Sequence, residues 1–189
     1  MNNDLLNILS NSNKDIDNQK LMDYLSGKLS AEKTHEIEKQ MTDSDFVNDA
    51  VEGLQEIKNK TNIDAGKKFL AENKKKPNVK VTPSGLQYEV ITMGQGKKPT
   101  RKDKVSCNYT GSFIDGTEFN NSYTMGGPVT FSVSGVIKGW TEALQMMPVG
   151  SKWKLYVPYT LAYGPGQYQT IPGGSALVFE IDLLSIVDK

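Results

Sequence analysis

Three segments in the second half of the chain alternate apolar and polar side chains with a period of two. They cover residues 104–110, 152–157 and 177–183. In an extended chain successive side chains point to opposite faces, so each segment has one apolar face and one polar face. The pattern predicts an antiparallel sheet that packs one face on a core and leaves the other in contact with water.

A helical period interrupts the strands between residues 136 and 147. Ile137, Trp140, Leu144 and Met147 recur three or four positions apart and form one apolar stripe. We expect this helix to lie across the concave face of the twisted sheet. The second half is therefore predicted to be an α+β domain, a twisted antiparallel sheet wrapped on one short helix.

The first part of the chain has only helical periods. Narrow apolar stripes predict helices over residues 19–26, 31–41, 46–60 and 64–76, and Pro77 ends the last one. Helices with such narrow stripes bury little apolar surface on their own. We expect this all-α module to pack on another surface, such as a second copy of the chain. A helical spacer with solvated faces is the alternative.

Composition changes sharply near residue 80. Residues 1–80 contain 27 charged side chains, three Gly and one Pro, whereas residues 81–189 contain 17 charged side chains, 14 Gly and seven Pro. Gly and Pro are typical of the turns between short elements, and dense mixed charge is typical of helices. We therefore expect a helical N-terminal module over residues 1–62, a linker helix and connector over 63–79, and a separate domain over 80–189.

Charge and rare residues exclude several functions. The 22 basic and 22 acidic residues cancel, which argues against a nucleic-acid binder. The single Cys, Cys107, and the single His, His35, cannot form a disulfide or a structural zinc site. We expect neither metal nor cofactor, and a buried, unreactive Cys107. The sequence shows no secretory signal and no membrane segment, so a cytoplasmic location is expected.

Aromatic residues are the only concentrated chemistry in the second half. No Ser/His/Asp set and no phosphate-binding loop is present. Seven aromatic side chains can approach one helix–sheet interface: Tyr109, Phe113, Phe119, Phe131, Trp140, Tyr163 and Phe179. They form either an ordinary core or a pocket. The polar atoms of Tyr and Trp need partners when buried, so an ordinary core explains Trp140 and the Tyr residues less well than the Phe residues.

Eight short strings carry a resemblance to a known family. They are PSGLQY (83–88), YTG (109–111), DGTEF (115–119), VIKGW (136–140), GSK (150–152), LAYG (161–164), IP (171–172) and LVF (177–179). In this order and spacing, residues 80–187 resemble the FKBP-type peptidyl-prolyl cis–trans isomerases. Residues 66–73, running into 84–88, resemble the linker helix of the bacterial macrophage-infectivity-potentiator subgroup. By contrast, residues 24–30 and 49–54 resemble cytosolic segments of Bacteroidetes anti-sigma-like proteins rather than that subgroup's dimerisation region.

The resemblance implies roles for particular residues. The residues that match catalytic positions of the family are Tyr109, Phe119, Asn120, Trp140, Tyr163 and Phe179. Those that match substrate-binding positions or the loop over the site are Phe131, Val136, Ile137, Tyr168 and Ile171. Trp140 would form the floor under a prolyl ring, and the Ile137 N–H and the Tyr163 hydroxyl would hold substrate carbonyl groups.

Two positions depart from the family pattern. The family usually carries Asp after the residue matched by Phe119, but this chain has Asn120. We expect weaker turnover or an altered preference, with binding retained. The loop over residues 165–174 is short, and its Tyr168 is either an added aromatic contact or an exposed tip residue.

The resemblance implies a peptidyl-prolyl cis–trans isomerase that acts on proline-containing unfolded or flexible polypeptides and assists their folding. It also implies binding of macrocyclic inhibitors of the family. Two alternatives stay open, a non-catalytic module that binds proline segments and a holding chaperone. In either of them the N-terminal helices would recruit a partner or form a homodimer.

Overall fold

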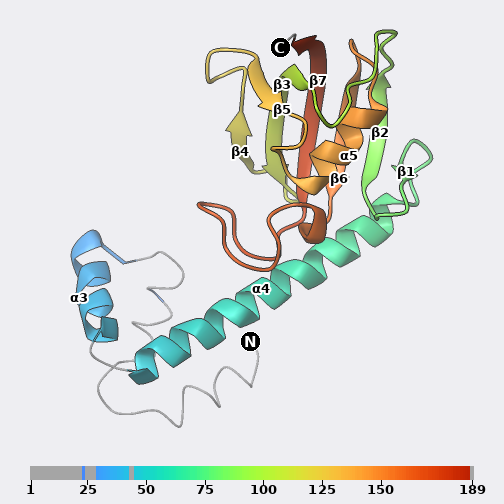
Figure 1. Cartoon of the computed structure of the whole chain (residues 1–189). Helices are drawn as coiled ribbons and strands as arrows, with labels where there is room; N and C mark the ends of the chain where they lie inside the picture. Colours follow the sequence, from blue (N-terminus) through green and yellow to red (C-terminus); the bar gives the residue numbers. More distant parts are fainter. Residues whose placement is uncertain (1–22, 24–28, 43–44, 188–189) are drawn as a thin grey trace. The chain divides into compact units, whose positions relative to one another are not determined.

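The computed structural model describes Asp23 and residues 29–42 and 45–187 (Figure 1). The chain divides into two compact units, Met1–Lys58 and Asn59–Lys189. In the first unit the structure describes helix α3 (Ala31–Thr42) and the beginning of helix α4 (Asp45–Asn73). No helix among the described residues combines the length and the apolar character needed to cross a membrane.

The helices differ in one respect from the sequence prediction. α3 matches the helix predicted over 31–41, and the helix predicted over 19–26 lies outside the described residues except for Asp23. The prediction of two separate helices over 46–60 and 64–76 is wrong, because the structure has the single helix α4 there. The junction at 61–63 contains neither Gly nor Pro, so nothing interrupts the backbone hydrogen bonds at that point.

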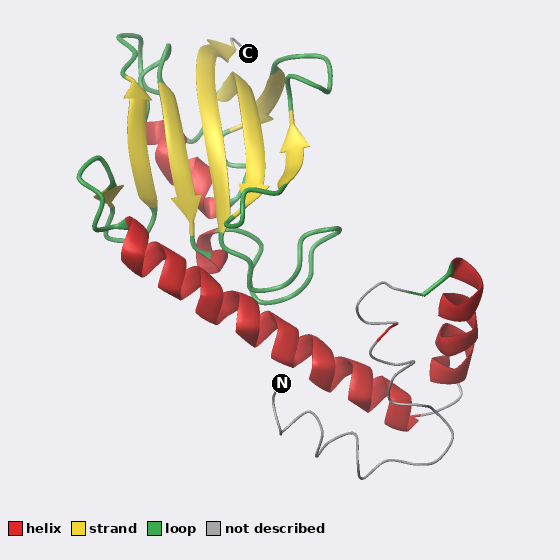
Figure 2. Ribbon diagram, turned by 180° about the vertical axis from the view of Figure 1, so that it is seen from behind, coloured by secondary structure: helices red, strands yellow, loops and turns green. Residues whose placement is uncertain are grey.

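The second unit contains one antiparallel sheet of seven strands (Figure 2). The strands are β1 (Lys80–Val81), β2 (Gln87–Thr92), β3 (Lys104–Phe113), β4 (Glu118–Asn121), β5 (Val129–Ser132), β6 (Lys152–Val157) and β7 (Leu177–Val187). Their order is β1-β2-β6-β7-β3-β4, and β5 also pairs with β3. The three alternating segments of the sequence correspond to β3, β6 and β7, which confirms the predicted sheet.

Helix α5 (Lys138–Met146) packs on one face of this sheet and closes the core. Trp140, Ala143 and Leu144 on the helix are buried together with core residues from β3, β6 and β7. Gly139 allows this close approach, because a Cβ atom there would lie 2.7 Å from Val157 Cγ1. The predicted α+β arrangement of a sheet on one short helix is confirmed.

The last part of α4 packs against the same unit, at one end of the sheet. The rings of Phe69 and Tyr156 lie 6.0 Å apart, and the Gln87 side chain donates a 2.8 Å hydrogen bond to the Leu70 carbonyl. Asn73 in turn donates to Gln87 Oε1 at 3.0 Å. Tyr156 is therefore only 5% exposed, although the sequence alternation places it on the polar face. The helix covers a position that the strand pattern alone leaves open to water.

Cys107 lies inside the core of the sheet. Its side chain is fully buried, and burial, together with the nearby Asp182 charge, raises the pKa of the thiol to about 12. Since the thiolate is the reactive form of cysteine, this side chain is inert at neutral pH. The prediction that this cysteine is buried is confirmed.

Candidate active site

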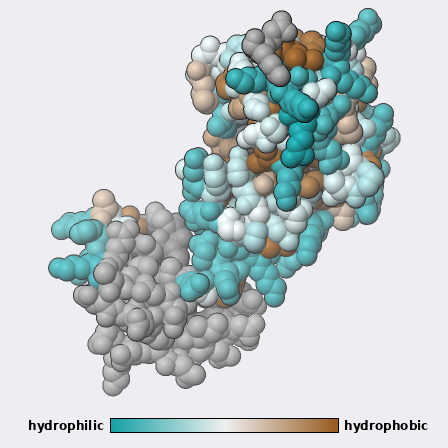
Figure 3. All heavy atoms as spheres, viewed as in Figure 1, coloured by the Kyte–Doolittle hydropathy of each residue, from teal (hydrophilic) through white to brown (hydrophobic). Residues whose placement is uncertain are grey.

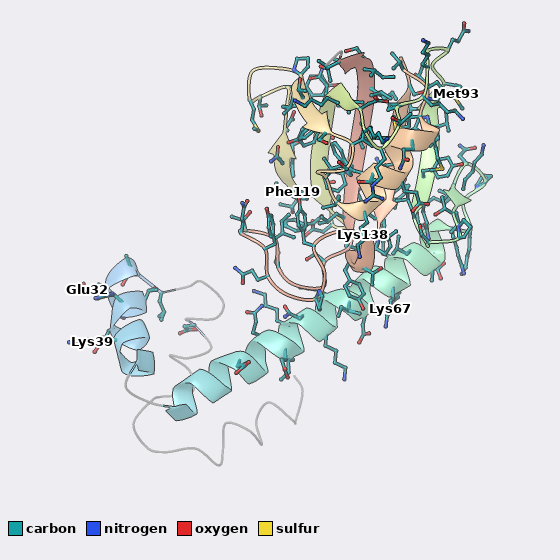
Figure 4. The ribbon with its side chains drawn as sticks, in the orientation of Figure 1. Glu32, Lys39, Lys67, Met93, Phe119 and Lys138 are labelled. Atoms are coloured by element: carbon teal, nitrogen blue, oxygen red, sulfur yellow. The ribbon has the colours of Figure 1, made fainter. Side chains whose placement is uncertain are left out.

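A cavity of about 250 Å³ opens at the side of the sheet where β3, β4 and β5 meet the beginning of α5. Phe119 and Lys138 mark, in Figure 4, the strand β4 and the helix α5 that border it. Its lining residues are Tyr109, Phe119, Asn120, Phe131, Gly135, Val136, Ile137, Trp140, Tyr163, Tyr168 and Phe179. Ten of the eleven residues that the sequence singled out for the site thus lie around one cavity.

Trp140 forms the aromatic centre of the cavity. Its side chain is 4% exposed, and three rings stand nearly perpendicular to it. The ring centroids of Tyr109, Phe131 and Phe179 lie 5.1, 5.5 and 5.4 Å from that of Trp140, at 85°, 76° and 89°. Edge-to-face contacts of this kind hold aromatic rings in fixed orientations. Trp140 and these three rings together form an aromatic box. The box is suited to an apolar ring of the size of a prolyl side chain.

The Tyr109 hydroxyl and Asn120 connect β3 to β4 at the rim. The hydroxyl donates a 2.9 Å hydrogen bond to Asn120 Oδ1. Burial raises the pKa of Tyr109 above its ordinary value, so the phenol stays protonated and keeps donating at neutral pH. The bond therefore fixes the orientation of the Asn120 amide.

The Ile137 N–H and the Tyr163 hydroxyl border the cavity and have no hydrogen-bond partner among the described residues. Ile137 precedes the first turn of α5, where backbone N–H groups lack intrahelical acceptors, and its own N–H makes no hydrogen bond in the described part of the chain. The Tyr163 hydroxyl is likewise unbonded there. Burial, and then the nearby Tyr168 and Tyr109, raise the pKa of Tyr163. Both donors are free to bind carbonyl oxygens of a ligand.

Tyr168 lies over Tyr163. The two rings are stacked, with centroids 4.4 Å apart and planes 10° apart. A tight turn positions Tyr168, because it exchanges two backbone hydrogen bonds of 3.0 and 2.9 Å with Ile171 while Gln169 adopts φ 51°. Tyr168 lines the cavity, yet its side chain is 47% exposed, so both alternatives left open by the sequence stay predictions.

Ile171 is placed differently from the other predicted site residues. It does not line the cavity, and its side chain is 7% exposed and packs in the hydrophobic core. The expectation that it overhangs the site is corrected accordingly, because the turn that carries Tyr168 outward directs Ile171 inward. Phe113 also lies outside the cavity, where it supports Phe119 from behind at 5.0 Å between centroids.

Two glycines at the site were missed as functional residues by the sequence reasoning. Gly135 lines the cavity directly. Gly111 lies behind the wall, where a Cβ atom would come within 2.9 Å of both Phe119 and Phe179. The string YTG is the only feature of the sequence that marks Gly111. The close approach of two rings to its backbone leaves no periodic pattern of apolar residues.

The described lining of the cavity is suited to binding a ligand and supplies no charged side chain that could take part in a reaction. None of the described lining residues is an acid, a lysine, an arginine or a histidine. No group of three or more His, Cys, Asp or Glu side chains in the described ranges could hold a metal ion. The site offers aromatic surface and hydrogen-bond donors, which suit an apolar ring flanked by carbonyl groups.

Comparisons with known proteins agree with this geometry. Residues 95–184 match the family described as FKBP-type peptidyl-prolyl cis-trans isomerase, and residues 2–90 match the domain amino terminal to FKBP-type peptidyl-prolyl isomerase. The crystal structure of FkpA from Escherichia coli is 35% identical in sequence, with a TM-score of 0.75 over 97% of this chain and 88% of that one. The chain belongs to the FKBP-type peptidyl-prolyl cis–trans isomerase family.

Curated relatives match over part of their length. The FKBP-type 22 kDa peptidyl-prolyl cis-trans isomerase of Escherichia coli K12 is 54% identical over 123 residues, 65% of this chain and 60% of that protein. Outer membrane protein MIP of Legionella longbeachae is 51% identical over 122 residues, 64% of this chain and 52% of that protein. The chain thus spans little more than half the length of these relatives.

The match at residues 2–90 corrects one expectation. Residues 24–30 and 49–54 were expected to resemble anti-sigma-like proteins rather than the dimerisation region of the macrophage-infectivity-potentiator subgroup. The N-terminal part instead matches the domain that precedes the isomerase domain in this family, and no comparison supports the anti-sigma resemblance. Short charged helices contain few distinctive sequence strings, so a resemblance over six or seven residues is weak evidence for a family.

Proposed function

We propose that this chain catalyses cis–trans rotation about X–Pro bonds in protein substrates. The observation that carries the proposal is the aromatic box around Trp140, bordered by the unpartnered Ile137 N–H and Tyr163 hydroxyl of the described chain. An apolar ring fits the box while the two donors bind carbonyl groups on either side of it. Membership of the isomerase family supports the same conclusion.

The reaction needs no nucleophile and no proton transfer. The barrier of about 18–20 kcal/mol arises because amide resonance is lost when the bond twists. An X–Pro bond left to itself therefore rotates over tens to hundreds of seconds. A site accelerates rotation when it binds the twisted imide better than the planar one. A water-poor aromatic cavity favours the twisted state, whose carbonyl oxygen carries less charge than that of a planar amide.

Removal of the Tyr163 hydroxyl tests this mechanism. In a tetrapeptide isomerase assay we expect Tyr163→Phe to lower kcat/KM by roughly three- to tenfold, the equivalent of one hydrogen bond of about 1 kcal/mol. The pKa values of Tyr109 and Tyr163 are both raised, so both phenols stay protonated at pH 9 and below. The rate of the wild-type chain should therefore be constant between about pH 6 and 9.

A macrocyclic inhibitor of the family provides the control. It should abolish the wild-type rate by filling the cavity. Tight inhibitor binding by a wild-type chain without isomerase activity would contradict the proposal and favour the non-catalytic binding module.

The substrates we propose are proline-containing unfolded or flexible polypeptides. The cavity is small and opens at the surface, so it admits one residue of a chain that has no fixed structure of its own. Hydrophobic residues on the face shown in Figure 3 form small groups separated by hydrophilic ones. That face offers no broad apolar surface for holding clients among the described residues, which supports the isomerase over the holding chaperone.

We propose in addition that the N-terminal helices form a homodimer. Support comes from the narrow apolar stripes of the sequence and from the match of residues 2–90 to the domain preceding the isomerase. Sedimentation of the full chain should give the mass of two chains, and residues 59–189 should give the mass of one. A monomeric full chain at tens of micromolar, or a dimeric shortened chain, would contradict this arrangement.

The cytoplasmic location stays a prediction from the sequence. One relative carries the words "outer membrane" in its name, so membership of the family gives no location.

A further inference from the structure

The rim of the cavity has an uncharged position on β4, directly after Phe119. Asn120 occupies it, and no other described lining residue bears a formal charge at neutral pH. Any charged side chain of a bound peptide therefore meets a field set by the groups just outside the cavity.

The Asn120 amide has a fixed orientation. Its Oδ1 accepts the 2.9 Å hydrogen bond from Tyr109, so the Nδ2 group is the end left for a ligand. Nδ2 has no partner in the described part of the chain, and it is not among the buried polar atoms that lack one. The rim thus presents two N–H donors to solvent where a carboxylate would present only acceptors.

A positively charged residue follows the last two lining residues before α5. Lys138 is exposed and directly follows Ile137, as the first residue of α5 (Figure 4). The N-terminal end of α5 adds a partial positive charge. The acid nearest in sequence, Glu118, lies outside the lining, and both of its carboxylate oxygens are 3.1 Å from Asn121 Nδ2. The described lining at the opening therefore offers hydrogen-bond donors and no formal negative charge.

We propose that Asn120 adapts this pocket to proline segments that carry an acidic residue directly before the proline. The Nδ2 donors bind the side-chain carboxylate of that residue, and Lys138 and the α5 N-terminus favour it electrostatically. An aspartate at position 120 would repel the same carboxylate and attract a lysine instead. This inference rests on the proposed function and names its substrate class.

Two matched peptides test the proposal. They have the sequences Ala-Glu-Pro-Phe and Ala-Lys-Pro-Phe with blocked ends, and kcat/KM is measured for the full chain by a protease-free isomerase assay. We expect the wild-type chain to favour the Glu peptide. Asn120→Asp should lower the Glu/Lys ratio of kcat/KM by roughly tenfold, because a unit charge a few ångströms away acts on both peptides in opposite directions. The change in the Glu/Lys ratio of kcat/KM should be smaller at 1 M salt.

Two further variants separate charge from hydrogen bonding. Glu118→Gln removes a negative charge from the same strand outside the cavity lining. It should raise the Glu/Lys ratio, and by a smaller factor than that by which Asn120→Asp lowers it, because screening weakens a charge that does not contact the ligand. Asn120→Ala removes the donors without adding charge, and it should lower the ratio by roughly threefold. An unchanged ratio in Asn120→Asp, or a wild-type preference for the Lys peptide, would overturn the proposal.

The proposed function can fail separately from this inference. A chain that turns over neither peptide contradicts the isomerase. In that case the ratio of dissociation constants for the same two peptides, from calorimetric titration of wild type and Asn120→Asp, still tests the preference. Equal ratios in the two chains would overturn it.

Discussion

Replacing Trp140 with leucine is expected to lower kcat/KM by at least roughly a hundredfold while leaving a folded protein. The indole forms the centre of the box, with three rings set at steep angles around it. Leucine fills part of the volume but offers no flat surface, so the neighbouring rings lose their contacts. Because Trp140 is only 4% exposed, the free energy of unfolding should fall by about 2–3 kcal/mol.

The chain contains a matched control for this substitution. Trp153 is 3% exposed, and its Nε1 atom, like that of Trp140, is buried with no partner among the described residues. It stacks on Tyr88 at 4.6 Å and does not line the cavity. Trp153→Leu should cost similar stability, by urea denaturation, yet keep kcat/KM within about threefold of wild type. Equal losses of activity in the two variants would show that Trp140 acts through stability alone.

Introducing valine at Gly111 should give the second largest effect. A Cβ atom at this position would come within 2.9 Å of the rings of Phe119 and Phe179, so both walls must move toward the cavity. Overpacking of this kind costs about 1–3 kcal/mol of stability. We expect kcat/KM to fall by more than roughly tenfold, since displaced rings occupy space that the prolyl ring needs.

Gly166→Val is the corresponding control. A Cβ atom at Gly166 would meet no atom within 4 Å, and the residue lies in the loop that carries Tyr168. The activity of this variant in the tetrapeptide assay and its urea midpoint should stay close to wild type. Should Gly111→Val bind a macrocyclic inhibitor as tightly as wild type, the cavity would not have narrowed and the explanation would fail.

Elements with a strong period were predictable from the sequence. The alternation in β3, β6 and β7 and the apolar stripe of α5 each depend on local spacing, and the structure has them where the sequence indicated. Short strands such as β5 have too few residues to show a period. The continuity of α4 was missed because its apolar stripe shifts along the helix, which made one helix resemble two.

Most of the site was predictable only as a set of matched strings. Trp140, Tyr109 and Phe179 come from α5, β3 and β7, and no local pattern shows that these elements bring them together. The inward position of Ile171 depends on a turn with Gln169 at φ 51°, which the sequence does not indicate because glycine or asparagine is usual there. The burial of Tyr156 depends on its contact with α4, a helix far from β6 in the sequence.

The loop that carries Tyr168 is held at two points. Tyr168 stacks on Tyr163 at the cavity, and Asn62 on α4 donates a 3.0 Å hydrogen bond to the Gly173 carbonyl at the loop's other end. The same loop therefore connects the cavity lining to α4. By thermodynamic reciprocity, any factor by which the packed helix tightened a ligand would equal the factor by which the ligand stabilised the packed helix.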